Sequence, residues 1–435
     1  MADRVDNHSL KERVNEILTD RAKVNNIVDI IEQLNCNDTV SVVNCIDGLG
    51  KIFTSFLKSG ECRPLGRGKS PRKKNEGENA EGPEEIFRTW LNQNYRATIK
   101  KCLELLLHSP NQEVQQQSLT TLMDLLRTES QNLHENFHGY IFPNQFFLRI
   151  MTSMIDGSRN MESVIKLFKQ YLHFTDISYY VLRNLSRIIS KILETRPQSK
   201  ESSAYFSRNV YHLLRQLSIP KSEGDMSCLF STPNNGDQSG DQSGDQSGDS
   251  GTLPIDHSVT NLASHKKVFT SAWTSFLNLP LDVDIHRLVL VALEKVMPNL
   301  LNPKILMDFL TDSYNIGGVT SILSLNSLFV LIHQYNLDYP DFYKRFYSLF
   351  DAEIFHLKYR ARFFYLADLF LTSTHLPAYL VAAFIKRLSR LALKAPPSGI
   401  ALILTFVGNL IRRHPSCKIL IHRKKVKLSE YPLIL

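Results

Sequence analysis

At 435 residues, the chain is long enough for two or three domains, and 43% hydrophobic with 22% charged residues is typical of a soluble globular protein. With 51 Lys and Arg against 43 Asp and Glu, the formal net charge is +8. Such an excess suits RNA-rich surroundings, but it also occurs in ordinary basic proteins. Six cysteines without a CxxC pair argue against a disulfide framework. The first residues lack an apolar core, so we expect no signal or transit peptide.

Helices are the elements expected along most of the chain. Apolar residues recur at helical spacing over 119–126 and again over 181–192, which predicts one buried helix face in each stretch. Alternating stretches typical of strands are nearly absent. Many amphipathic helices separated by short breaks predict an all-α fold. We expect an irregular HEAT/armadillo-like α-solenoid of stacked helix pairs, because a single pair cannot bury its own apolar stripe.

A basic segment interrupts the amino-terminal helices. Residues 61–83 are rich in Lys, Arg, Gly, Glu and Asn and cannot form an apolar core, so we predict a disordered loop. A nuclear localisation signal or an electrostatic RNA contact would use such a loop, and a basic loop that is merely solvated is the alternative. Its six cations are Arg63, Arg67, Lys69, Arg72, Lys73 and Lys74.

An HExxH motif occurs at His134, Glu135 and His138. In zinc peptidases the two histidines of this motif lie one helical turn apart and bind the metal, while the glutamate activates a water. Here Gly139 and Pro143 limit any helix, and a third ligand such as Glu162 has no support from its surroundings. We therefore interpret the motif as a polar turn between helices and keep an HExxH zinc hydrolase as an alternative.

Three GDQS units occupy 236–247 and mark a flexible linker. We predict three parts of the chain: an amino-terminal helical repeat region at 1–220, a linker at 221–252, and a carboxy-terminal helical domain at 253–435. No chemistry is assigned to the linker.

A hydropathy scan could flag two apolar stretches, 313–337 and 363–385, as membrane spans. The first has no charged residue, whereas the second contains Asp368 and, near its middle, Pro377. A turn is more natural at that proline than a helix in hydrocarbon. The inner helices of a solenoid are covered on several sides and are equally apolar, so we expect no membrane protein.

The helix that Pro377 opens combines a core-facing apolar stripe with a basic ridge. Lys386, Arg390 and Lys394 recur every four residues, which suits rRNA phosphates or the carboxylates of an acidic partner; a solvated helix face is the alternative. Aromatic and basic residues between the carboxy-terminal helices are further candidates for partner binding. Packing between helices would also explain the aromatic residues, and hydrogen bonds to loop carbonyls would also explain the arginines. The candidates for partner or rRNA binding are Tyr359, Arg360, Arg362, Tyr379, Lys386, Arg387, Arg390 and Lys394.

The joints between the carboxy-terminal helices carry unusual sequences in a fixed order. They are YNLDYPDFY at 335–343, KYRARFF at 358–364, STHLPAYLVAAFIKRL at 373–388 and RRHPS at 412–416. Over about 269–423 this series resembles the nucleolar complex protein family, also called the CCAAT-binding factor family. Before that range the resemblance extends only to helical character and the order of elements.

The resemblance implies a non-enzymatic scaffold of ribosome assembly that acts in the nucleolus on small-subunit precursors and 18S rRNA maturation. Its implied partners are nucleolar protein fourteen, other components of the small-subunit processome and pre-18S rRNA, with no cofactor and no small-molecule substrate. Residues 424–435 depart from the family's pattern, so we expect a truncated or alternative carboxy terminus. The helical pattern alone also fits a generic helical-repeat adaptor in transport or trafficking.

Overall fold

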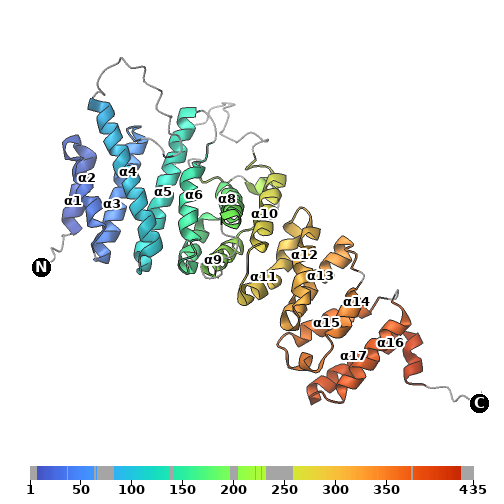
Figure 1. The fold of residues 1–435 in the computed structure, drawn as a ribbon. Coiled ribbons are helices and arrows are strands. Elements are labelled where there is room, and N and C mark those ends of the chain that lie inside the picture. Colours follow the sequence, from blue (N-terminus) through green and yellow to red (C-terminus); the bar gives the residue numbers. More distant parts are fainter. Residues whose placement is uncertain are drawn as a thin grey trace, which may run out of the picture. The chain divides into compact units, whose positions relative to one another are not determined.

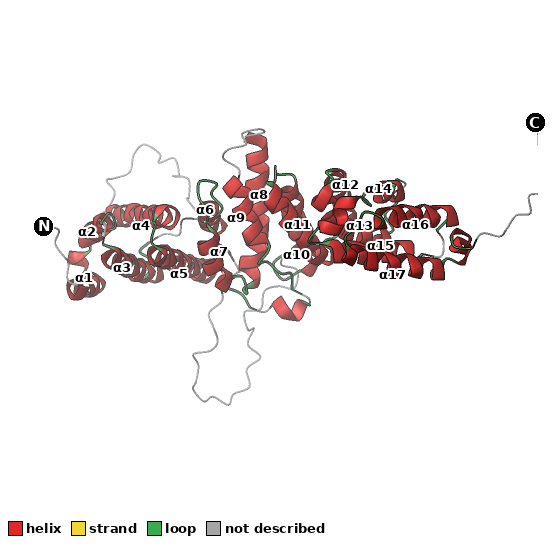
Figure 2. Ribbon diagram, turned by 90° about the horizontal axis from the view of Figure 1, so that it is seen from below, coloured by secondary structure: helices red, strands yellow, loops and turns green. Residues whose placement is uncertain are grey.

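The computed structural model describes residues 7–36, 38–62, 65, 83–137, 141–195, 204–220, 222–226, 228–231, 258–339, 341–373 and 376–422. Every regular element within these residues is an α-helix or a 3₁₀ turn, as the ribbon in Figure 2 shows. Contacts divide the chain into two compact units. The first comprises 1–285 with 299–301, and the second 286–298 with 302–435. The predicted division at 221–252 remains a prediction.

Helices α1 to α10 of Figure 1 lie within the first unit and differ widely in length. Their bounds are α1 Asn7–Thr19, α2 Asn26–Gln33, α3 Thr39–Lys58, α4 Pro83–His108, α5 Gln112–Phe137, α6 Asn144–Met154, α7 Glu162–Phe168, α8 Thr175–Thr195, α9 Ala204–Leu214 and α10 Leu262–Leu277. The stripe expected over 119–126 is buried in α5, and the stripe expected over 181–192 is buried in α8 at Val181, Leu185 and Ile189.

Helix α3 shows how the sequence of the first unit sets its packing. The Asp38 side chain accepts a hydrogen bond from the Ser41 backbone N–H at 3.2 Å and so caps the first turn. Helix α3 buries apolar residues such as Leu49 and Phe53 and packs against α5, and the Phe53 ring lies 5.3 Å from that of Tyr95 in α4. A Cβ atom on Gly50 would lie 2.8 Å from Thr121 Cγ2, so glycine is needed where these two helices approach.

Helices α12 to α17, with most of α11, belong to the second unit. Their bounds are α11 Val283–Val296, α12 Met307–Asn315, α13 Gly318–Tyr335, α14 Phe342–Ser348, α15 Arg360–Leu371, α16 Ala378–Ala392 and α17 Pro397–Arg413. Aromatic rings form much of the core: Phe346 lies 5.8 Å from Phe363 and 5.4 Å from Phe370, measured between ring centroids. Helix α13 ends at Asn336, whose left-handed backbone (φ 50°) lets its N–H reach the Leu331 carbonyl.

Neither of the two apolar stretches that a hydropathy scan could flag as membrane spans forms one long helix. The range 313–337 is divided between α12 and α13, and 363–385 is divided between α15 and α16. Among the described residues, the helix that is long and apolar enough to cross a membrane is instead Thr39–Lys58. Half of that window is buried inside the protein, as in the core helix of a soluble protein. By length and composition alone this is weak evidence for a membrane span.

Candidate interaction surface

Helix α16 follows Pro377, whose extended backbone (φ −58°, ψ 134°) supplies the helix N-cap. Its buried stripe is Val381, Phe384, Ile385 and Leu388. Leu380 and Leu391, at the flanks of this stripe, are half-buried. The Phe384 ring packs against Phe346 and Phe350, at centroid distances of 5.5 and 5.3 Å. This packing fixes the rotation of α16 and therefore which side chains point outward.

Four of the eight candidate residues are exposed on α16 or in the turn directly after it. Tyr379 is 77% exposed, and Lys386, Arg390 and Lys394 are exposed as well. The spacing of seven and four residues keeps Tyr379, Lys386 and Arg390 on one side of the helix, and Lys394 follows four residues later in the turn. None of the three cationic side chains has an ion pair or hydrogen bond within the described part of the chain. The ridge expected from the sequence thus exists as a row of free positive charges beside a tyrosine.

Three of the other four candidates, all arginines, bond to other residues of the second unit. Arg360 Nη1 donates to the Phe355 carbonyl at 2.9 Å, and Arg387 Nε donates to the Phe350 carbonyl at 2.8 Å. Arg362 pairs with Glu294 (Nη2 to Oε2, 2.6 Å), and Tyr359 is a half-buried residue at the start of α15. These contacts hold neighbouring segments together, as expected if arginines brace loop carbonyls. A role in partner binding remains a prediction for them.

Arg63, Arg67, Lys69, Arg72, Lys73 and Lys74 of the basic loop lie outside the described residues. Leu65, described within this segment, donates its backbone N–H to Glu129 Oε1 at 3.0 Å. The Tyr95 hydroxyl donates to the same oxygen at 2.8 Å. Burial raises the pKa of Glu129 to about 7, against the opposing effect of these two hydrogen bonds. A buried carboxyl group with a shifted pKa therefore lies beside the described residue of the loop.

The HExxH motif begins in the last turn of α5, not in a turn between helices as we expected. Helix α5 extends to Phe137 and so includes His134 and Glu135, whereas His138 lies outside the described residues. Glu162, considered as a third ligand, is paired with Lys166 at 2.9 Å and lies 3.8 Å from His212. The described residues contain no group of three His, Cys, Asp or Glu that could hold a metal ion.

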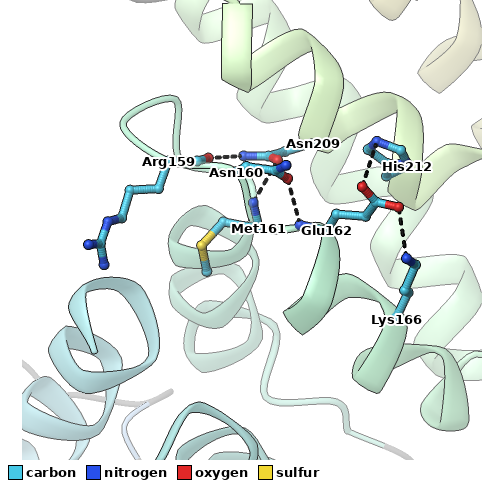
Figure 3. Close-up of polar contacts among 7 residues, drawn as sticks. All are labelled: Arg159, Asn160, Met161, Glu162, Lys166, Asn209 and His212. Atoms are coloured by element: carbon cyan, nitrogen blue, oxygen red, sulfur yellow. Dashed lines mark hydrogen bonds and ion pairs between the residues drawn. The ribbon is translucent and has the colours of Figure 1, made fainter. Parts of the chain in front are cut away.

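A buried asparagine organises the first unit in a way that the sequence did not reveal. Asn209 of α9 donates its side-chain amide to the carbonyls of Asp156 and Arg159, both at 2.8 Å, and accepts from the Met161 N–H at 3.0 Å. Figure 3 shows this amide against the loop that precedes α7. Arg159 in turn donates to the His108 carbonyl at 2.7 Å, at the end of α4. One side chain thus fixes the loop between α6 and α7.

A second buried polar contact holds residues inside the range 221–252, where we expected a linker. The Asp176 carboxylate of α8 accepts hydrogen bonds from the Phe230 N–H (2.9 Å), the Ser231 N–H (3.3 Å) and the Ser231 hydroxyl (3.0 Å). Arg127 donates to the Phe230 carbonyl at 3.0 Å and lies 4.6 Å from the centroid of its ring. Residues 228–231 therefore pack on the first unit.

Comparison with known proteins matches both units. A family model described as "Nucleolar complex protein 4-like, TPR repeats" matches residues 2–194, and one described as "CBF/Mak21 family" matches residues 321–431. The Nucleolar complex protein 4 homolog of Gallus gallus is 36% identical over 434 residues, which cover 98% of this chain and 80% of that relative. The chain belongs to the nucleolar complex protein 4 family.

Other members of the nucleolar complex protein 4 family are similarly related. The homolog of Danio rerio is 34% identical over 95% of this chain and 75% of its own length, and that of Homo sapiens is 32% identical over 95% and 77%. Membership confirms the nucleolar localisation and the general role in ribosome biogenesis that the resemblance implied. The family's TPR repeats, together with the helices described above, confirm the helical-repeat solenoid. The CBF/Mak21 match includes most of 424–435, where we expected a departure from the family.

Proposed function

We propose that the chain is a non-enzymatic nucleolar scaffold in small ribosomal subunit assembly and 18S rRNA maturation. It acts by binding nucleolar protein fourteen and pre-ribosomal particles in fixed amounts. The observation that carries the proposal is the exposed side of α16 and of the turn after it, where the side chains of Tyr379, Lys386, Arg390 and Lys394 have no bonding partner in the described residues. Free cations beside an aromatic ring are suited to carboxylates or phosphates of another molecule. Direct contact with pre-18S rRNA is a second use of the same charges.

Depletion and replacement in cells test this proposal. Depleting the protein should cause unprocessed 18S precursors to accumulate, and the wild-type chain should restore processing. A chain with Lys386→Glu, Arg390→Glu and Lys394→Glu should reach the nucleolus but recover less nucleolar protein fourteen and restore processing poorly.

A matched control makes the same change of charge in the first unit. Lys58→Glu, Arg96→Glu and Lys267→Glu reverse three exposed cations there and should leave processing and partner recovery unchanged. Normal 18S processing in depleted cells would contradict the proposal. Zinc analysis of the purified protein tests the hydrolase alternative, since stoichiometric zinc that is lost with His134→Ala would favour an HExxH enzyme.

A further inference from the structure

Helices α6 and α8 of the first unit each carry an exposed polar stripe that contains arginine. The members, at spacing i, i+4 and i+7, are Gln145, Arg149 and Thr152 in α6 and Arg183, Arg187 and Ser190 in α8. This spacing keeps each set on one side of its helix. Lys191 of α8 is exposed as well, so the two helices present four cations to solvent.

Helices α6 and α8 contact each other where the two stripes begin. Asn184 Nδ2 of α8 donates to Asn144 Oδ1 of α6 at 2.8 Å. Gln145 adjoins Asn144 and Arg183 adjoins Asn184 in the sequence, so the stripes meet at this hydrogen bond. Figure 1 shows α8 next to α6. One ligand that lies across this contact can reach both stripes.

The three arginines of the stripes are not used for packing within the described part of the chain. Arg149, Arg183 and Arg187 have no hydrogen bond or ion pair to another described residue. Arg127 and Arg159 of the same unit, by contrast, donate to backbone carbonyls at 3.0 and 2.7 Å. A guanidinium group that stays free on a helix surface is available to an anion from outside, and its planar fork fits phosphate oxygens.

Acidic side chains are scarce around these arginines. Helix α6 contains no Asp or Glu, and neither does α10, which packs on α8. In α8 itself, Asp176 is buried by its hydrogen bonds to Phe230 and Ser231, and Glu194 lies in the last turn. Repulsion by neighbouring carboxylates is therefore weak, and the surface attracts anions.

The other residues of the two helices indicate which anion fits. Neither α6 nor α8 exposes a large apolar or aromatic side chain, although such side chains form the centre of most protein interfaces. Gln145 and Ser190 are instead of the types that contact phosphate and sugar groups together with arginine. Without an exposed ring, the surface also lacks the stacking platform that single strands use. A double helix, recognised by its shape and its backbone, fits best.

We propose that the exposed stripes of α6 and α8 bind the backbone of double-helical RNA without reading its sequence. Arg149, Arg183 and Arg187 pair with phosphate oxygens, while Gln145 and Ser190 bond to phosphates or to 2′-hydroxyl groups. This contact goes beyond the proposed function, because it lies in the first unit and requires neither the cations of α16 nor nucleolar protein fourteen.

An RNA duplex tests the surface directly. The probe is a fluorescent duplex of about 20 base pairs, whose binding to the full chain is followed by anisotropy at several salt concentrations. Changing Arg149, Arg183 and Arg187 together to Glu should weaken binding at least about tenfold. The slope of log K against log salt should decrease in magnitude by about three, one for each lost phosphate contact. Duplexes of unrelated sequence should bind alike.

A matched control makes the same change of charge elsewhere in the first unit. Arg13→Glu on α1, Lys58→Glu on α3 and Lys169→Glu directly after α7 reverse three exposed cations and should together weaken binding less than about threefold. Serine at the six cations of the basic loop separates the stripes from that loop, and the tenfold loss should persist in such a chain. Thermal melts of all variants should match wild type, because every changed helix position is exposed.

Five outcomes would overturn the proposal. They are a wild-type chain that does not bind the duplex, an equal loss of binding in the matched control, disappearance of the loss in the chain with serines in the basic loop, tighter binding of oligouridine or of a DNA duplex of the same sequence, and competition by a polyglutamate peptide as strong as that by unlabelled RNA duplex. The last would assign the stripes to an acidic protein. In each case the proposed scaffold role stands, because recovery of nucleolar protein fourteen and 18S processing are measured on the α16 variant.

Discussion

Two glycines in long helices, one in each unit, differ in what lies next to them. Gly50 of α3 lies against Thr121 of α5, where a Cβ atom would approach Cγ2 to 2.8 Å, whereas Gly408 of α17 faces open space. In the first unit, buried polar groups such as Asn209 likewise find their partners within the chain. On α16, by contrast, the exposed side chains of Lys386 and Arg390 have no bonding partner among the described residues, and Leu404 of α17 is 66% exposed. Internal contacts therefore account for Gly50 but not for Gly408.

The largest expected effect on stability comes from removing the buried hydrogen bonds of Asn209 in the first unit. Asn209→Leu leaves two backbone carbonyls and one N–H buried without their side-chain partner, which should lower the free energy of unfolding by about 4 kcal/mol. Asn209→Asp should lose at least as much at neutral pH, since its carboxylate still accepts from the Met161 N–H but places a buried charge against two carbonyl oxygens. Urea unfolding followed by circular dichroism measures both, and a loss under about 1 kcal/mol for Asn209→Leu would contradict this account.

The second prediction concerns the pH dependence that Glu129 gives to the first unit. Its pKa of about 7 in the folded protein lies above the ordinary 4.5, so the folded state keeps a proton that the unfolded chain has lost. This contribution to stability is complete at low pH and decreases as pH rises from about 4.5 to about 7, by on the order of 3 kcal/mol.

Glu129→Gln removes the titrating group and should flatten this part of the stability curve. Urea unfolding of wild type and variant at about pH 5 and about pH 8 measures the difference. A wild-type chain whose stability relative to Glu129→Gln rises over this interval would show the opposite sign and refute the assignment.

Gly50→Ala should lower the free energy of unfolding by about 2 kcal/mol, because the new methyl group overlaps Thr121 Cγ2. Adding Thr121→Ser removes the overlapping methyl group and should restore part of the loss. The coupling energy of the two substitutions in a double-mutant cycle is the decisive quantity. Additive effects would mean that the close approach of α3 and α5 does not explain the glycine.

The smallest expected effect has the opposite sign. Gly408→Ala adds a methyl group in open space and improves helix propensity, so it should raise stability by about 1 kcal/mol. A shift in the melting temperature of the second unit would show this. A destabilising Gly408→Ala would mean that α17 is packed on its outer side within the chain itself, which would remove the contrast with Gly50.

Periodicity was sufficient to predict the helices and most of their buried faces, because amphipathic spacing is a local property of the sequence. It also located the exposed ridge of α16. It could not separate Arg387, which bonds to the Phe350 carbonyl, from Arg390 only three residues later, since that difference depends on the neighbouring segment. Asn209 was missed for the same reason: its partners lie about 50 positions earlier in the chain, and an isolated asparagine has no distinctive pattern.

The anchoring of Phe230 and Ser231 by Asp176 has a practical consequence. On the other side of the GDQS tract, the Val259 carbonyl accepts from His265 Nε2 at 2.6 Å, so both flanks are held by the same unit. Residues inserted between these two flanks therefore begin and end at segments that are hydrogen-bonded to the first unit. An affinity tag or fluorescent protein inserted there would label the protein internally, and natural gain or loss of GDQS units should be tolerated in the same way.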